Sequence, residues 1–236
     1  MTLNKDKKIY LKKIGKAGDY EVWLVDGSYV RKVINENFVE YDYHFNHSFI
    51  PKNEFWIDEQ TNHSEWRFFT DRMLAEQDLI KAGKSEKEAS EKSALLEKKE
   101  RKSELRKRHS ADELIKNRSD LSLKIKKKIF GEYDGKIKIW LVDGKSVRDF
   151  YFIDYAEGGH DKVYDFIPKD EIWIDEVLHP EEIKFIVLHE LSERRLMSEG
   201  LKYSEAHKRA TLVEDYYRDH KAETEEKIKD EIKKQE

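Results

Sequence analysis

The 236-residue sequence contains no cysteine, and this absence excludes several kinds of site. Without thiols the chain has no disulfide framework, no cysteine-based zinc finger and no thiol nucleophile. No apolar run approaches the about 18 residues of a membrane-spanning helix, and the first residues lack the apolar stretch of a signal peptide. We therefore expect no membrane association and a cytoplasmic location.

Two common catalytic motifs and a dominant charge are also missing. The only adjacent glycine pair, Gly158-Gly159, is followed by His160 and Asp161, so no phosphate-binding loop is present. No serine lies in a nucleophile-elbow motif. The 46 Lys and Arg residues against 50 Asp and Glu residues give a net charge of -4, which does not indicate a nucleic-acid-binding protein as a whole.

The composition nevertheless predicts a folded protein. Charged residues make up 41% of the chain and the mean hydropathy is -0.91. Hydrophobic residues still make up 38% and aromatic residues 12%, which is too much for a disordered chain. The length fits one large domain or two small ones.

An internal repeat organises the chain. Three segments recur 117 residues apart, and roughly a third of the aligned positions match at this one spacing. The segments are Trp-Leu-Val-Asp-Gly at 23–27 and 140–144, Phe-Ile-Pro-Lys at 49–52 and 166–169, and Trp-Ile-Asp-Glu at 56–59 and 173–176. A period of this length predicts a tandem duplication of whole units, not a solenoid of small repeats.

The patterns within one copy predict strands followed by helices. Alternating residues at 136–141 indicate a strand, Asp143-Gly144 a hairpin turn and residues 147–153 the returning strand. We expect a loop at Gly158-Gly159 and one or two short strands within 164–174. The fold class is therefore α+β, a small antiparallel sheet followed by a helical hairpin, in two copies.

Two helices complete each copy. In the second copy, His179-Pro180 followed by two acids predicts the start of the first helix, and Gly200 its end. Ser204 is expected to cap the second helix. We predict a degenerate first repeat unit at 1–101, a charged helical connector at 102–124, a second repeat unit carrying the candidate site at 125–218, and a charged helical tail at 219–236.

The two copies differ in their histidines. In the first copy, His189 is replaced by Arg72 and His207 by Ser90, whereas the aromatic and glycine framework is common to both. The other aligned pairs are Glu190 with Met73, His160 with Tyr43, Glu193 with Glu76, Glu214 with Glu97, and Arg218 with Arg101. Relaxed selection on one copy of a site leaves such a pattern, and so does ordinary drift. We favour a site in the second copy.

The string His189-Glu190-Leu191-Ser192-Glu193 resembles the HExxH motif of zinc metallopeptidases, with Glu193 in place of the second histidine. Positions one and five of that motif lie one helical turn apart and ligate one metal ion. The resemblance implies that His189 and Glu193 are ligands, since carboxylates also bind zinc. It further implies that Glu190 is the general base toward the metal-bound water.

Three residues are candidates for the third ligand. In a regular antiparallel hairpin, Glu214 faces His189, and glutamate-type zinc peptidases take a downstream glutamate. His207 lies in the same helix as Glu214, but the hairpin register places it about 10 Å from His189 along the axis. His160 follows the glycine pair and is the third candidate.

Structural roles explain the same residues equally well. Glu193, Glu214 and Arg218 persist in the copy without histidines, which indicates an ion-pair clamp between the helices. His207 then forms a hydrogen bond across the hairpin, and His160 is a turn residue.

These observations predict a metal-dependent, peptidase-like hydrolase with a divalent ion, zinc by preference, in the second copy. The substrate is unknown, and a protein is one candidate. One alternative is a nucleic-acid-binding protein that uses the basic run from Lys98 to Arg108, although glutamates interleave with this run as on a solvated helix. The other alternative is a non-enzymatic interaction or structural scaffold.

Overall fold

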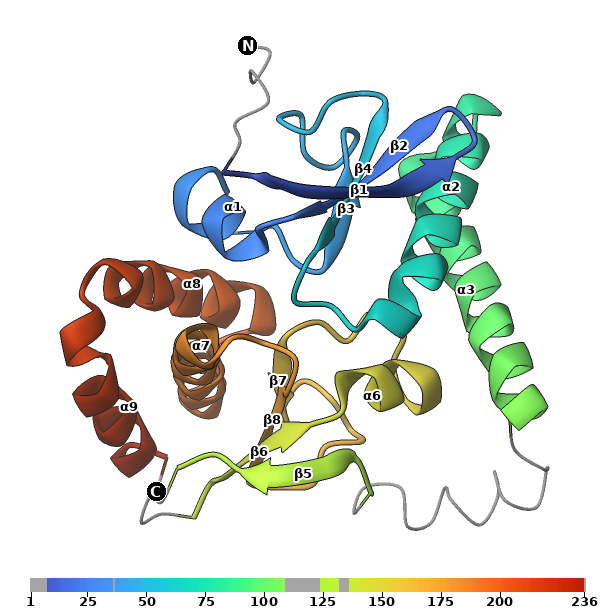
Figure 1. Ribbon diagram of the computed structural model, residues 1–236. Coiled ribbons are helices and arrows are strands. Elements are labelled where there is room, and N and C mark those ends of the chain that lie inside the picture. The colour runs from blue at the N-terminus through green and yellow to red at the C-terminus, as the bar shows by residue number, and fades with distance from the viewer. Residues whose placement is uncertain (1–7, 36, 109–123, 132–135, 236) are drawn as a thin grey trace. The chain divides into compact units, whose positions relative to one another are not determined.

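The chain forms two units, which Figure 1 shows in a computed structural model. The structure describes residues 8–35, 37–108, 124–131 and 136–235. Unit one comprises Met1–Asp120 and unit two Leu121–Glu236. Among the described residues, no helix has both the length and the apolar character that crossing a membrane requires.

Unit one has four strands and then two long helices. Its elements are β1 (Tyr10–Ala17), β2 (Tyr20–Val25), α1 (Gly27–Val33), β3 (Tyr41–Tyr43), β4 (Glu54–Asp58), the short 3-10 helix η1 (His63–Glu65), α2 (Trp66–Lys81) and α3 (Glu86–Arg108). The helix α3 thus extends through the basic run. Residues 109–123 of the predicted connector lie outside the described residues.

Unit two repeats this order and adds a helix. Its elements are β5 (Lys126–Ile129), β6 (Lys138–Val142), α6 (Gly144–Phe150), β7 (Gly158–His160), β8 (Glu171–Asp175), α7 (Pro180–Ser198), α8 (Tyr203–Asp219), the 3-10 helix η2 (Lys221–Glu223) and α9 (Thr224–Lys233). The additional helix α9 lies in the predicted charged tail.

The two sheets have the same topology, in the orders β1-β2-β4-β3 and β5-β6-β8-β7. In both sheets the central pair is parallel and the outer pairs are antiparallel. The repeated tryptophans are partners across the central pair, Trp23 with Trp56 and Trp140 with Trp173. The predicted α+β class and the duplication are confirmed. The sheet differs in one detail, since it is mixed where a purely antiparallel sheet was expected.

The predicted hairpin turn at Asp143-Gly144 is wrong, because these residues begin a helix. The side chain of Asp143 accepts a hydrogen bond from the Ser146 amide at 3.2 Å and caps α6. Residues 147–150 of the predicted returning strand belong to this helix instead. A crossover segment of this kind is what the parallel central pair requires, since a two-residue turn joins only antiparallel strands.

A buried ion pair attaches α6 to the sheet. The Arg148 guanidinium lies 3.2 Å from the Asp175 carboxylate at the end of β8, and both side chains are 1% exposed. In unit one, Arg31 and Asp58 form the same pair at 2.7 Å. A Cβ on Gly144 would lie 1.7 Å from the Asp175 carboxylate oxygen. Glycine is therefore required where the helix start meets this carboxylate.

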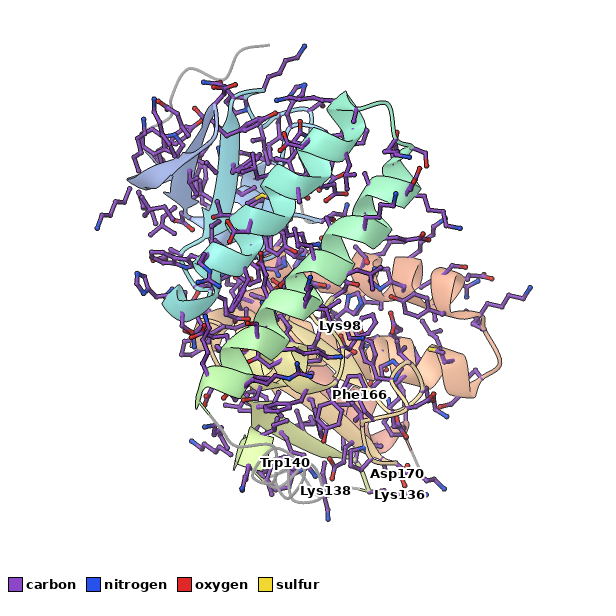
Figure 2. The ribbon with its side chains drawn as sticks, turned by 90° about the vertical axis from the view of Figure 1, so that its right-hand side faces the viewer. Lys98, Lys136, Lys138, Trp140, Phe166 and Asp170 are labelled. Atoms are coloured by element: carbon purple, nitrogen blue, oxygen red, sulfur yellow. The ribbon has the colours of Figure 1, made fainter. Side chains whose placement is uncertain are left out.

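The core of each unit surrounds its buried strands. Trp56 and Trp173 are fully buried, whereas Trp23 and Trp140 are partly buried. Trp140 and Phe166 pack against the cluster around Trp173 (Figure 2). A second cluster between the sheet and α7 contains Ile174 and Leu191. The sheet thus fixes the inner face of α7, the helix that carries His189.

We expect Gly144→Ala to lower the free energy of unfolding by about 2 kcal/mol or more, because the added methyl group displaces a buried carboxylate from its arginine. Gly15→Ala is the matched control, since a Cβ there meets nothing within 4 Å. Urea unfolding monitored by circular dichroism measures both. Equal stability of the two variants would contradict this role of Gly144.

Candidate metal centre

The site lies on two consecutive helices whose ends follow from local sequence. His179 occupies the capping position of α7, Pro180 its first turn, and Gly200 follows it with a φ of +98° that glycine adopts without strain. These ends are as predicted. The helix α8 begins at Tyr203, with Lys202 in the capping position that was predicted for Ser204.

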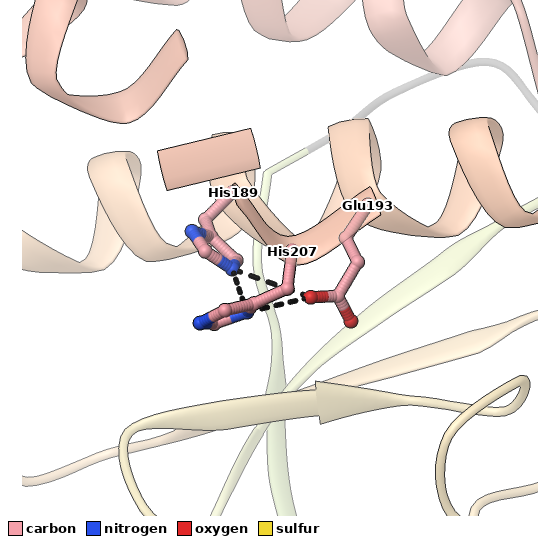
Figure 3. Close-up of side chains that lie close together, drawn as sticks. All are labelled: His189, Glu193 and His207. Atoms are coloured by element: carbon pink, nitrogen blue, oxygen red, sulfur yellow. Dashed lines mark hydrogen bonds and ion pairs between the residues drawn. The ribbon is translucent and has the colours of Figure 1, made fainter. Parts of the chain in front are cut away.

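Three side chains from α7 and α8 converge on one point (Figure 3). His189 Nε2 lies 3.1 Å from His207 Nδ1, and His207 Nδ1 lies 2.8 Å from Glu193 Oε2. The third distance, from His189 Nε2 to Glu193 Oε2, is 3.5 Å. Ligand atoms on one face of a tetrahedral zinc ion are about 3.3 Å apart, given bonds of about 2.0–2.1 Å. The longest side is near this value and the other two are hydrogen-bond distances, so the three atoms lie close to the spacing that such an ion requires.

The register estimate that placed His207 too far from His189 is wrong. It compared positions along the helix axes and left out the reach of the side chains. His207 and Glu214 lie two turns apart on α8, about 10 Å along the axis. Both side chains nevertheless contact the His189 ring, Glu214 at Nδ1 and His207 at Nε2.

Glu214 orients His189 so that its other nitrogen, Nε2, faces His207 Nδ1 and Glu193 Oε2. His189 Nδ1 lies 2.9 Å from Glu214 Oε2, and a carboxylate can only accept, so Nδ1 carries the proton. Glu214 Oε1 accepts from Arg218, which also bonds to Glu182 at 2.8 Å. Metal-binding histidines in proteins usually donate their second N–H to a carboxylate in this way.

The same clamp exists in unit one, with an arginine in place of the histidine. Arg101 bonds to Glu97 at 2.8 Å and to Glu65 at 2.7 Å. Arg72, the counterpart of His189, bonds to Glu97 at 3.2 Å. Sequence analysis missed the Glu182 member of the clamp, although its counterpart Glu65 lies at the same spacing of 117 residues.

His160 contacts Glu193 from the sheet side. Its Nδ1 accepts a hydrogen bond from the Lys162 amide at 3.1 Å, so its Nε2 carries the proton. This Nε2 donates to Glu193 Oε1 at 3.0 Å. In this arrangement the one unprotonated nitrogen of His160, Nδ1, is occupied by the Lys162 amide, and the ring orients Glu193 so that Oε2 faces the two other histidines.

The glycine pair before His160 forms the edge strand β7, where a loop was predicted. A Cβ on Gly158 would lie 2.9 Å from Ile186 on α7, and one on Gly159 would lie 2.4 Å from the Tyr164 ring. Unit one has Tyr41 and Asp42 at these positions. Gly158 therefore lets β7 approach α7 closely, next to the point where His160 reaches Glu193, and Gly159 leaves room for the Tyr164 ring.

The electrostatics of the site favour a positive charge between the carboxylates. Burial lowers the pKa of His189, but hydrogen bonds to Glu193 and Glu214 outweigh burial and raise it to about 10. Burial raises the pKa of Glu193, but hydrogen bonds from His160, His189 and His207 outweigh it and hold that pKa well below its usual range. At separations of 2.8, 3.1 and 3.5 Å, these three atoms need either a proton on a histidine nitrogen or a cation among them.

Glu190 lies next to this triangle. One of its oxygens is within 4.8 Å of ligand-type atoms of both His160 and Glu193. Burial raises the pKa of Glu190 to about 8, partly offset by His189. The Glu190 side chain also packs closely against β7, since a Cβ on Gly158 would lie 3.3 Å from the Glu190 Cγ.

The basic run on α3 is partly structural. Lys98 lies on this helix (Figure 2), whereas Arg101 is 1% exposed and belongs to the clamp of unit one. Lys126 of the second basic cluster bonds to Glu171 at 2.7 Å and lies over the Trp140 ring. These two side chains are not available to phosphates. Nucleic-acid binding through the remaining lysines stays a prediction.

Comparisons of the chain with family models, curated proteins and solved structures gave no match. The function of this chain is therefore inferred from the geometry of the site.

We expect Arg218→Met to destabilise the protein by about 3–5 kcal/mol, because Glu182 and Glu214 lose the cation that compensates their buried charges. Arg101→Met should have the same effect in unit one. The control Arg209→Met removes an exposed i,i+4 pair with Glu205 and should cost about 0.5 kcal/mol or less. Urea unfolding measures all three, and a cost for Arg218→Met no larger than the control would refute the clamp.

Proposed function

We propose that unit two is a metal-dependent hydrolase whose ion, zinc by preference, is held by His189 Nε2, Glu193 Oε2 and His207 Nδ1. The observation that carries the proposal is the triangle of these three atoms, with sides of 2.8, 3.1 and 3.5 Å. Glu214 and His160 are assigned to orientation of the ligands, since their own contacts occupy them.

Three protein ligands leave one position open, as in catalytic zinc sites. The His207 side chain is 45% exposed, and Tyr203, which stacks on its ring, is also exposed. Solvent and substrate therefore have access from the α8 side. A zinc ion held by these ligands would lower the pKa of its bound water toward neutrality. Glu190 is the carboxylate next to the ligands, and it would accept the water proton once the charge of the ion lowers its own raised pKa.

The substrate class follows from the resemblance to zinc metallopeptidases and is part of the proposal. We propose a peptide bond as the bond that is hydrolysed. The competing scaffold function requires none of the histidines, and unit one forms the same fold with Arg72 and Ser90 at two of these positions. Metal binding distinguishes the two functions.

We expect protein purified without an affinity tag to bind one zinc ion per chain, as measured by elemental analysis and calorimetry. His189→Ala should abolish binding because it removes one of three ligands and opens the site. Glu190→Gln should retain the ion because this residue is not a ligand. His220→Ala is the matched control at the end of α8, where the ring stacks on Tyr216. Unchanged zinc binding by His189→Ala would contradict the proposed metal site and favour the scaffold function.

A second prediction concerns catalysis. With the ion bound, Glu190→Gln should reduce the hydrolysis of fluorogenic peptides by about 100-fold or more, the usual contribution of a general base. Zinc content, measured on the same sample, should be unchanged. Full activity of this variant would exclude Glu190 as the base, while a parallel loss of zinc would show that it is a ligand.

A further inference from the structure

The two units differ in how the outer face of their first long helix is covered. In unit two, α9 packs along α7 (Figure 1). Ile228 and Ile232, one turn apart on α9, belong to the same buried cluster as Val187 and Leu191 of α7. The cover is therefore an amphipathic helix that contributes two aliphatic side chains.

Ion pairs flank this apolar contact. Glu225 of α9 lies 3.5 Å from Lys184 of α7, and Glu231 lies 2.7 Å from Arg195. Acidic side chains of the covering helix thus meet basic side chains of the covered one.

The equivalent face of unit one is a groove. Trp66, Thr70 and Leu74 of α2 occupy the positions of Ile183, Val187 and Leu191. With β1 they line a groove of about 600 Å³. Val187 and Leu191 are fully buried, whereas Thr70 and Leu74 are partly exposed. Within the described part of unit one, no helix covers this face.

The rim of the groove is basic. Lys12, Lys13, Lys16 and Arg67 line it, and Asp71 is the one acidic side chain among its lining residues. Arg67 occupies the position of Lys184, the α7 residue that pairs with Glu225 of α9. Its own pair with Asp71, at 3.7 Å, is exposed. Asp78 occupies the position of Arg195, which pairs with Glu231. The rim therefore complements the Glu225 end of a helix like α9 and not its Glu231 end.

The strand side of the groove is open as well. Gly15 of β1 lines it, and a Cβ at this position would meet nothing within 4 Å. Neither packing nor a positive φ requires a glycine there. The register of β1 against β2 shifts between Lys13 and Gly15, and a glycine within a strand often marks such a bulge.

We propose that the groove between β1 and α2 of unit one binds an amphipathic helix of a partner protein. The partner helix carries two aliphatic residues one turn apart and an acidic flank. The template is α9, which makes the same kind of contact with α7. This proposal is independent of the metal site, which lies in unit two.

A labelled peptide with the sequence of residues 221–235, which includes α9, is a direct probe. We expect saturable binding to the full chain, measured by fluorescence anisotropy. The double variant Lys12→Glu and Lys16→Glu should weaken binding at least about tenfold, through reversed rim charges on exposed side chains. Leu74→Lys should do the same through the apolar floor. Lys87→Glu, on an exposed part of α3, is the matched control and should leave binding unchanged.

Four results would overturn the proposal. One is the absence of binding, and another is binding that ignores the groove variants, which would place the peptide elsewhere. A third is displacement of the peptide by a single-stranded oligonucleotide at low salt, which would identify the groove as a nucleic-acid surface. The fourth is binding that appears only after Leu114→Ser and Ile115→Ser in the connector, outside the described residues, which would show that this segment of the chain itself occupies the groove.

Discussion

The structure of each unit depends on a buried arginine that joins the two long helices. Arg218 bridges Glu182 and Glu214 in unit two, and Arg101 bridges the corresponding pair in unit one. Buried charges are costly unless each is paired, so the three groups have to stay together. This requirement fixes the register of one helix against the other, and every contact across the helix pair is set by it.

The candidate site uses the second carboxylate oxygen of the clamp's glutamate. In unit one the second oxygen of Glu97 bonds to Arg72, and in unit two the second oxygen of Glu214 bonds to His189. Arg72 brings a permanent positive charge to this position, while an imidazole provides one only with a proton or beside a bound ion. The two units thus share the clamp, and the position next to it holds an arginine in unit one and a histidine in unit two.

Making room for this site required changes outside the helices. The glycines of β7 replace larger residues of β3, which brings His160 to Glu193 and Glu190 against the strand. The two units also differ in how their first long helix is covered. In unit two, α9 packs on α7, whereas no described helix covers the corresponding groove of unit one. The two units share a framework and, within the residues that the structure describes, differ in which faces their own chain covers.

The sequence by itself determined the duplication, the α+β class, the helix pair and the glutamate that faces His189, because a repeated pattern and helical periodicity are local properties. Only the tertiary structure decided the parallel central strand pair, the helix at Asp143 and the meeting of His207 with His189. Asp-Gly begins a hairpin or caps a helix with equal local chemistry, and a distant carboxylate, Asp175, selects the helix. His207 and Glu214 lie two helical turns apart, yet both side chains are long enough to contact the ring of His189. The spacing of these residues along the chain does not predict this contact.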